Sequence, residues 1–188
     1  MKYFKSTEDW QFNSRISKED NKWLLHGEGF RIATELLEKH ILEADSSNQD
    51  FVIYPYCYLI RHYIEIRLKE VIDEGSKIKG LTNSPTKGGH DLSILWRKSQ
   101  EVLEEVWGEE HSEAPANVKD FINELHSIDV KSDNFRYPID KAGQATLDTI
   151  PTINFKLVAE IFSEVKDYLD GITDGLAVKK DNINTDWS

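Results

Sequence analysis

The sequence predicts an all-α fold, an antiparallel helical bundle of about five helices with a long functional loop before the last helix. Apolar residues recur at helical spacing in five segments, and turns rich in Gly, Pro, Ser or Asn separate most of them. The best strand candidate, residues 150–153, is short and contains a proline. The chain has 188 residues, of which 39% are hydrophobic, so it has the length of one domain and enough apolar material for one core.

The first helix is expected over residues 17–44, because Ser17 starts an acidic first turn and apolar residues follow at helical spacing. Gly27 and Gly29 cost such a helix about 1 kcal/mol each relative to Ala, so we expect a bend or a close helix approach there. The second helix follows a turn and ends near Glu74. Pro55 fits this helix only within its first turn.

A polar loop over residues 75–89 leads to a third helix, which begins near Leu92 and is closed by Gly108. A shorter fourth helix starts at Pro115, and a fifth ends at Gly171. The segment between the fourth and fifth helices, residues 129–150, has no periodicity but carries aromatic and charged residues. Structureless loops longer than about 12 to 15 residues are usually functional or disordered, and this one is too aromatic for simple disorder.

We expect a single helical domain over residues 17–172, with an N-terminal extension (1–16) and a loose, polar C-terminal tail (173–188). The sequence contains neither the roughly 18 to 20 uncharged apolar residues of a membrane span nor a signal-peptide pattern at its start. A cytoplasmic protein without a membrane partner is therefore expected. Cys57 is the single cysteine, so we expect a small buried apolar residue and no disulfide or zinc knuckle.

The formal charge of -11 argues against a protein that coats nucleic acid, because phosphate binding requires a basic surface. The charge is unevenly spread. Residues 101–124 hold eight acidic side chains and one basic one, whereas residues 60–100 hold eight basic and five acidic ones. A small basic site near the second helix is compatible with this distribution, and the acidic region is expected to be a solvated surface.

The second helix carries one narrow polar strip. At about 100° per residue, a strip roughly 100° wide contains Tyr58, Arg61, His62, Glu65 and Lys69. Most of the remaining circumference of the helix is apolar. A helix of this kind is a central one, so its polar strip is expected to line a cleft.

Within the strip, Arg61 and Glu65 are spaced to form an ion pair, and Glu65 is near enough to His62 to orient its ring and raise its pKa. This arrangement makes His62 a candidate general acid or base. The alternative is a buried hydrogen-bonded network that only fixes helix packing.

Two further segments carry candidate residues. His90 is expected just outside the N-terminus of the third helix, with Asp91 as N-cap, where it could act on or contact a phosphate or simply satisfy loop carbonyls. In the long loop, Arg136 and Tyr137 offer a guanidinium and a ring for phosphate contact and base stacking, or they pin the loop to the core. The other histidines lack metal-ligand spacing and no phosphate loop is present, so we expect no metal and no cofactor.

Three stretches together resemble bacterial members of the HEPN superfamily: Leu59–Lys69, Gly89–Leu92 and Phe135–Pro138. The resemblance covers about residues 20–170. It implies an antiparallel bundle that often forms homodimers across its polar face and belongs to toxin–antitoxin, abortive-infection or other phage-defence systems. The active branch consists of metal-independent ribonucleases, in which an Arg and a His from both subunits cleave RNA with its own 2′-hydroxyl.

The chain departs from that branch in one respect: no Arg is followed by a His after four to six residues. Only Arg61 and His62 carry over. The first hypothesis is an RNA- or nucleotide-directed protein, with His62 or His90 as acid or base, Glu65 orienting His62, Arg61 and Arg136 binding phosphate, and Lys69 and Tyr137 in the same substrate-binding group. The second is a non-catalytic dimerisation or protein-interaction module, with an antitoxin or defence protein as partner, and the third is small-nucleotide sensing.

Overall fold

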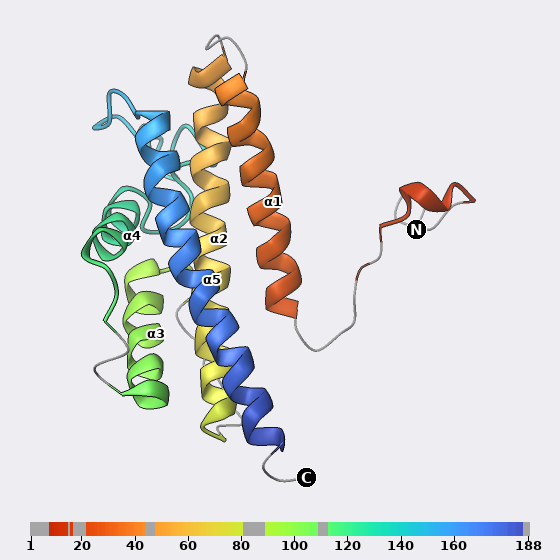
Figure 1. The fold of residues 1–188 in the computed structure, drawn as a ribbon. Coiled ribbons are helices and arrows are strands. Elements are labelled where there is room, and N and C mark those ends of the chain that lie inside the picture. The colour runs from red at the N-terminus through yellow and green to blue at the C-terminus, as the bar shows by residue number, and fades with distance from the viewer. Residues whose placement is uncertain are drawn as a thin grey trace.

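The computed structural model confirms the all-α fold. It describes residues 8–14, 16, 22–43, 48–80, 89–108 and 113–185. Within these ranges the chain forms one short 3-10 helix, five α-helices and no strand (Figure 1). The elements are η1 (Trp10–Phe12), α1 (Lys22–Glu43), α2 (Gln49–Ile78), α3 (Leu92–Trp107), α4 (Ala116–Ile128) and α5 (Phe155–Thr185). None of the helices described combines the length and apolar character of a transmembrane segment.

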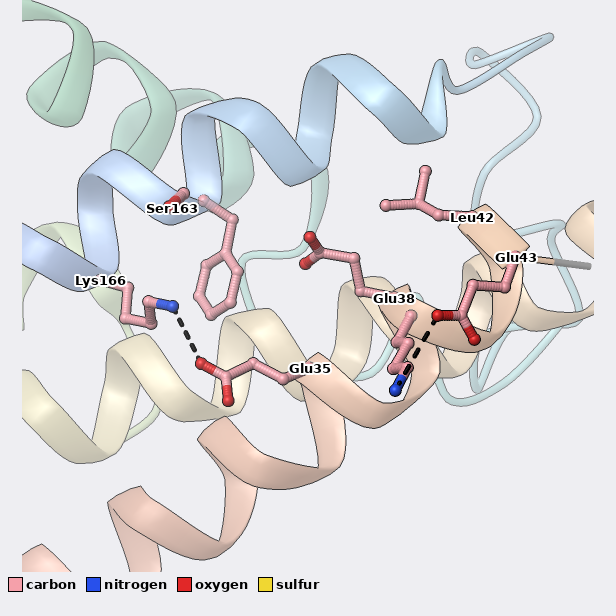
Figure 2. Close-up of a pocket in the computed structure, with 8 residues that line it drawn as sticks. Glu35, Glu38, Leu42, Glu43, Ser163 and Lys166 are labelled. Atoms are coloured by element: carbon pink, nitrogen blue, oxygen red, sulfur yellow. Dashed lines mark hydrogen bonds and ion pairs between the residues drawn. The ribbon is translucent and has the colours of Figure 1, made fainter.

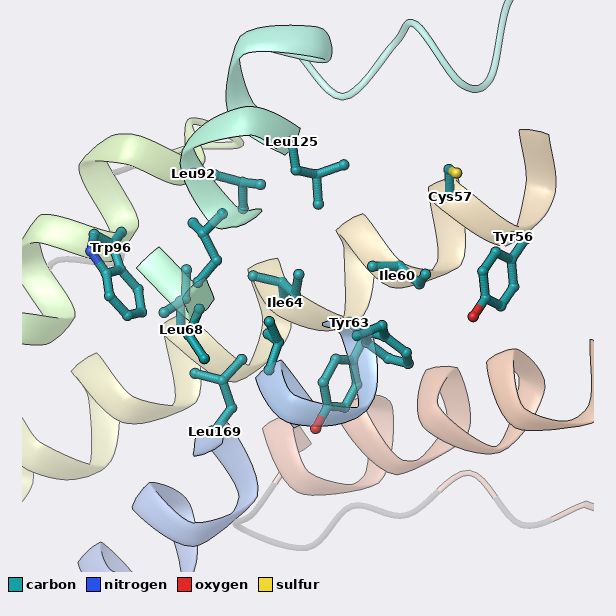
Figure 3. Packing of buried hydrophobic residues seen from close by; sticks show 14 of the residues in the cluster. Tyr56, Cys57, Ile60, Tyr63, Ile64, Leu68, Leu92, Trp96, Leu125 and Leu169 are labelled. Atoms are coloured by element: carbon teal, nitrogen blue, oxygen red, sulfur yellow. The ribbon is translucent and has the colours of Figure 1, made fainter. Parts of the chain in front are cut away.

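The predicted central helix is α2. From Ile60 to Ile72 every residue except His62 and Lys69 is buried, because α1, α3 and α5 all pack against this helix. Figure 3 shows apolar side chains of α2 meeting those of α3, α4 and α5 in one core. His62 and Lys69 are thus the only residues of this stretch with partly exposed side chains.

Ion pairs tie α1 to the rest of the bundle. The buried Arg67 of α2 binds Glu28 of α1 (2.7 Å) and Asp170 of α5 (2.8 Å). Lys166 of α5 reaches Glu35 of α1 at 2.9 Å (Figure 2). The close approach predicted at Gly27 is also present, since a Cβ there would lie 3.3 Å from Arg67 Nε.

The ends of α3 and the start of α4 confirm the sequence prediction. Asp91 is the N-cap of α3, and its carboxylate accepts a hydrogen bond from the Ile94 backbone N–H at 3.0 Å. Gly108 ends α3 with a φ of 90°, a conformation that favours glycine. Pro115 directly precedes α4. The first helix begins at Lys22, and the part of it predicted over residues 17–21 lies outside the described residues.

The second helix is longer at both ends than predicted. It begins at Gln49, so Pro55 lies beyond the first turn, and the prediction that confined this proline to the first turn is wrong. Pro55 is exposed, where water can solvate the backbone carbonyl that loses its partner. At the other end, α2 continues through Gly75 to Ile78, and Gly75 allows α3 to pack closely against it. A Cβ at Gly75 would lie 2.2 Å from Val102 Cγ1.

The last helix does not end at Gly171, and residues 173–185 are not a loose tail. The helix α5 continues to Thr185 because its C-terminal half is packed. Leu176 is buried in a second cluster with residues of α2 and α3, and Lys180 binds Glu74 at 2.8 Å. Tertiary contacts therefore override the helix-stop signal of Gly171.

The two glycines Gly75 and Gly171 should respond in opposite ways to alanine. Gly75→Ala is expected to lower the free energy of unfolding by about 1–3 kcal/mol, because the new methyl group collides with Val102. Gly171→Ala meets no atom within 4 Å and should raise it by about 0.5–1 kcal/mol through helix propensity. Urea unfolding of both variants checks this. Equal effects would show that α2 and α3 do not meet at Gly75.

Candidate functional site

The guanidinium of Arg61 lies at the centre of a buried polar network. Its side chain is 0% exposed, and it pairs with Glu65 as the spacing predicted, with Nη1 2.9 Å from Oε2. Arg61 Nη2 donates to the backbone carbonyl of His90 at 2.6 Å, and Nε donates to that of Asp129 at 3.1 Å. Arg61 thereby joins three segments of the chain and has no exposed surface for a phosphate.

Glu65 is the second member of the network. Its side chain is 1% exposed, and Oε1 accepts from Lys69 Nζ at 2.7 Å and lies 2.8 Å from His90 Nδ1. Burial acts to raise the pKa of Glu65, but the hydrogen bonds and charges of Lys69 and His90 outweigh it, so the pKa lies below its ordinary value. Glu65 is therefore ionised at neutral pH.

His90 brings this network to the surface. The imidazole is held at Nδ1 by Glu65, yet 64% of its side chain is exposed. Because an ionised carboxylate accepts from Nδ1–H, the favoured neutral tautomer has its lone pair on Nε2, at the opposite, exposed edge of the ring. A buried carboxylate that fixes a solvent-exposed imidazole is an arrangement suited to general base chemistry.

His62 does not have the environment that the sequence predicted. Burial is the largest influence on it and lowers its pKa, while the charge of Glu65 acts in the opposite direction and is outweighed. Glu65 therefore acts on the pKa of His62 in the predicted direction, but the pKa of His62 lies below its ordinary value because burial outweighs this effect. The hydrogen bonds of Glu65 go to Arg61, Lys69 and His90, so the imidazole that Glu65 orients is that of His90.

Aromatic rings hold His62 instead. Its imidazole is stacked on Tyr58, with centroids 5.7 Å apart, and meets the ring of Phe30 edge to face at 4.4 Å. The guanidinium carbon of Arg136 lies 5.7 Å from the centre of the Tyr58 ring and 5.5 Å from that of Tyr137. Arg136, Tyr58 and His62 thus form a continuous column.

The long loop is anchored by a residue that sequence reasoning missed. Asp129 is 0% exposed; its Oδ1 accepts from the backbone N–H of residues 133 and 134, and its Oδ2 lies 3.3 Å from Arg61 Nε. Phe135 is buried in the core. Arg136 donates to the Ser132 carbonyl at 2.6 Å. The loop is therefore held in a fixed structure. The only feature of the sequence that pointed to Asp129 was its position at the end of the fourth helix.

The structure brings most of the predicted residues together. Glu65 links Arg61, Lys69 and His90 directly, and Tyr58 links His62 to Arg136. The exposed groups are the His90 ring, Tyr137 and part of Arg136. Cys57 lies elsewhere, is buried as predicted, and burial raises its pKa to about 12.

Comparison with protein-family models, with curated proteins and with solved structures found no match. Among the residues that the structure describes, no group of three or more His, Cys, Asp or Glu side chains could hold a metal ion.

Removal of the Arg61 charge should cost much more than removal of an exposed one. Arg61→Met leaves Glu65 and Asp129 buried without their cation, so we expect a loss of about 3–5 kcal/mol in the free energy of unfolding. Arg97→Met is the control, because Arg97 pairs with Glu101 at the same spacing but both are more than half exposed; about 1 kcal/mol or less is expected. Similar losses in the two variants, measured by denaturant unfolding, would contradict the buried network.

The low pKa of His62 predicts a specific pH dependence. The ordinary pKa of a histidine is 6.5. Below pH 6.5 the unfolded chain binds a proton at His62 more readily than the folded chain does. The free energy of unfolding therefore falls as the pH falls toward the pKa of the folded state. In His62→Phe, which keeps a ring between Tyr58 and Phe30, this part of the loss disappears. Unfolding free energies of both proteins at pH 7.5 and pH 5.5 measure it, and a larger acid-induced loss in the variant would refute it.

Proposed function

We propose that this chain acts on RNA, as a HEPN-like, metal-independent ribonuclease, at the surface formed by His90, Lys69 and Arg136. The single observation that carries the proposal is the pairing of a buried, ionised Glu65 with an exposed His90. Side chains arranged in this way serve acid–base reactions on a substrate that approaches from solvent.

The reaction uses the 2′-hydroxyl of the substrate as nucleophile. His90 Nε2 takes the proton of that hydroxyl, the 2′-oxygen bonds to phosphorus, and the bond from phosphorus to the 5′-oxygen breaks. The 5′-oxygen takes a proton from water, and the hydroxide that remains takes the proton from His90. The products are a 2′,3′-cyclic phosphate and a 5′-hydroxyl. Glu65 is a positioning residue, because it holds the His90 ring and stabilises its positive charge.

Lys69 and the long loop add groups that suit a nucleic-acid substrate. The ammonium group of Lys69 binds the same carboxylate oxygen as His90. In the loop that Arg61 ties to the His90 turn, Arg136 adds positive charge and Tyr137 offers an exposed ring on which a base can stack. His62, which burial keeps neutral, supports Tyr58 beneath Arg136. Arg61 acts through Glu65 and has no contact with substrate in this proposal.

A second candidate function is a non-catalytic dimerisation or protein-interaction module of a toxin–antitoxin or phage-defence system. An apolar stripe on the outer face of α1 favours it. The stripe consists of residues at helical spacing with exposed side chains: Leu25 (48% exposed), Ile32 (48%) and Leu36 (65%). Phe51 and Tyr54 of α2 add exposed aromatic surface. A second copy or an antitoxin covers this stripe in that case.

Substitution of His90 tests the ribonuclease proposal. His90→Gln should lower the rate of single-stranded RNA cleavage in EDTA by about 10²- to 10⁴-fold, because the general base is lost. His40→Gln is the matched control, since His40 is an exposed histidine of α1 away from the network. Denaturing gels and detection of the cyclic phosphate give the measurement, and RNA lacking the 2′-hydroxyl should resist cleavage.

Two results would overturn this function. One is His90→Gln protein that cleaves RNA as fast as the parent chain. The other is a parent chain that neither cleaves RNA nor impairs growth on expression, while Leu36→Asp abolishes its association with a partner. The second result would establish the interaction module instead.

A further inference from the structure

A second surface of the molecule lies apart from the His90 network. It is a groove of about 780 Å³ between α4, residues 150–154 and the first turns of α5. Cys57 and Ile60 of α2 form part of its lining, and Figure 3 shows both residues on α2 below Leu125 of α4. A volume of this size, lined mostly by apolar side chains, is typical of binding sites.

The groove is open and acidic at its edge. Leu157, on the first turns of α5, is 64% exposed although it lines an apolar groove. Asp120 and Glu124 of α4 supply carboxylates to the same lining, within the region that holds eight acidic residues against one basic residue. An occupant that matches this groove is apolar at its centre and basic at its flanks.

The chain itself contains a segment with those properties. In the N-terminal segment, Trp10, Phe12 and Ile16 are 78%, 80% and 93% exposed, and η1 has no buried residue. Residues 1–18 contain four basic and two acidic side chains. Three large apolar side chains in water are costly, because each would gain about 1.5–3 kcal/mol from full burial.

In its own copy the segment does not occupy the groove. Figure 1 shows η1 on the α1 side of the bundle, whereas the groove lies between α4 and α5. Because Trp10, Phe12 and Ile16 are all exposed in their own copy, the burial that they lack is available in the groove of a second copy.

We propose that the N-terminal segment of a second copy of this chain, centred on Trp10, Phe12 and Ile16, docks into the groove between α4 and α5. Reciprocal exchange buries both segments and both grooves and closes a symmetric dimer. The excess of basic residues in this segment, four against two acidic ones in residues 1–18, complements the carboxylates of Asp120 and Glu124. This interface is separate from the His90 site and from the apolar stripe of α1.

Cross-linking between isotopically distinct copies tests the contact directly. The full chain carries p-benzoyl-phenylalanine at position 12, one half of the sample is ¹⁵N-labelled, and the two halves are mixed and irradiated. We expect cross-links from position 12 to α4 or to residues 150–161 that join a labelled copy to an unlabelled one. Cross-links confined to one copy, or directed elsewhere, overturn the proposal.

A matched pair of substitutions on α5 tests the energetics. Leu157→Asp places a charge in the groove and should raise the dissociation constant of the dimer at least about tenfold. Val178→Asp, also on α5 and 61% exposed but outside the groove, should change it less than about twofold. Sedimentation equilibrium measures both, and the double variant Trp10→Ala, Phe12→Ala should match Leu157→Asp.

The outcomes separate this inference from the proposed ribonuclease. A full chain that stays monomeric at all concentrations, or a dimer that Leu157→Asp leaves unchanged, refutes arm exchange whatever the RNA assay shows. Loss of cleavage in His90→Gln with an intact dimer supports the catalytic proposal without bearing on the groove.

Discussion

A guanidinium with no exposed surface must find all of its hydrogen-bond acceptors within the protein. Arg61 is in this position, and it finds them on Glu65, on the turn before α3 and on the segment after α4. The turn that carries His90 and the loop that carries Arg136 are therefore both held by one side chain of the central helix. The His90 turn and the long loop lie together because Arg61 takes acceptors from both.

The charges of the buried network balance without His90. Arg61 and Lys69 supply two positive charges, and Glu65 and Asp129 supply two negative ones. The buried part is thus neutral before His90 is counted. In the proposed reaction, the proton that His90 takes from the substrate therefore leaves a net positive charge at the surface, where the charge of the phosphate develops. A network with a net negative charge would instead repel a phosphate.

Local features of this site were predictable from the sequence, and long-range ones were not. The Arg61–Glu65 pair and the Asp91 cap depend on residues three or four positions apart, so spacing reveals them. Glu65 and His90 are 25 positions apart, and Arg61 and Asp129 are 68 apart. No periodicity relates such residues. Similarly, Gly171 reads as a helix stop, and only the packing of Leu176 against α2 and α3 shows that α5 continues.

The net charge of -11 takes on a clearer meaning once these positions are known. The acidic residues of α3 and α4 include two that line the apolar groove, whereas Lys69 of α2 shares the Glu65 carboxylate with His90 and Arg136 lies in the long loop, outside the groove lining. A polyanion is therefore repelled from the groove and attracted toward the imidazole, while a basic, aromatic segment is attracted toward the groove. In the two proposals made above, the charge distribution therefore keeps the nucleic-acid site and the groove from competing for the same partner.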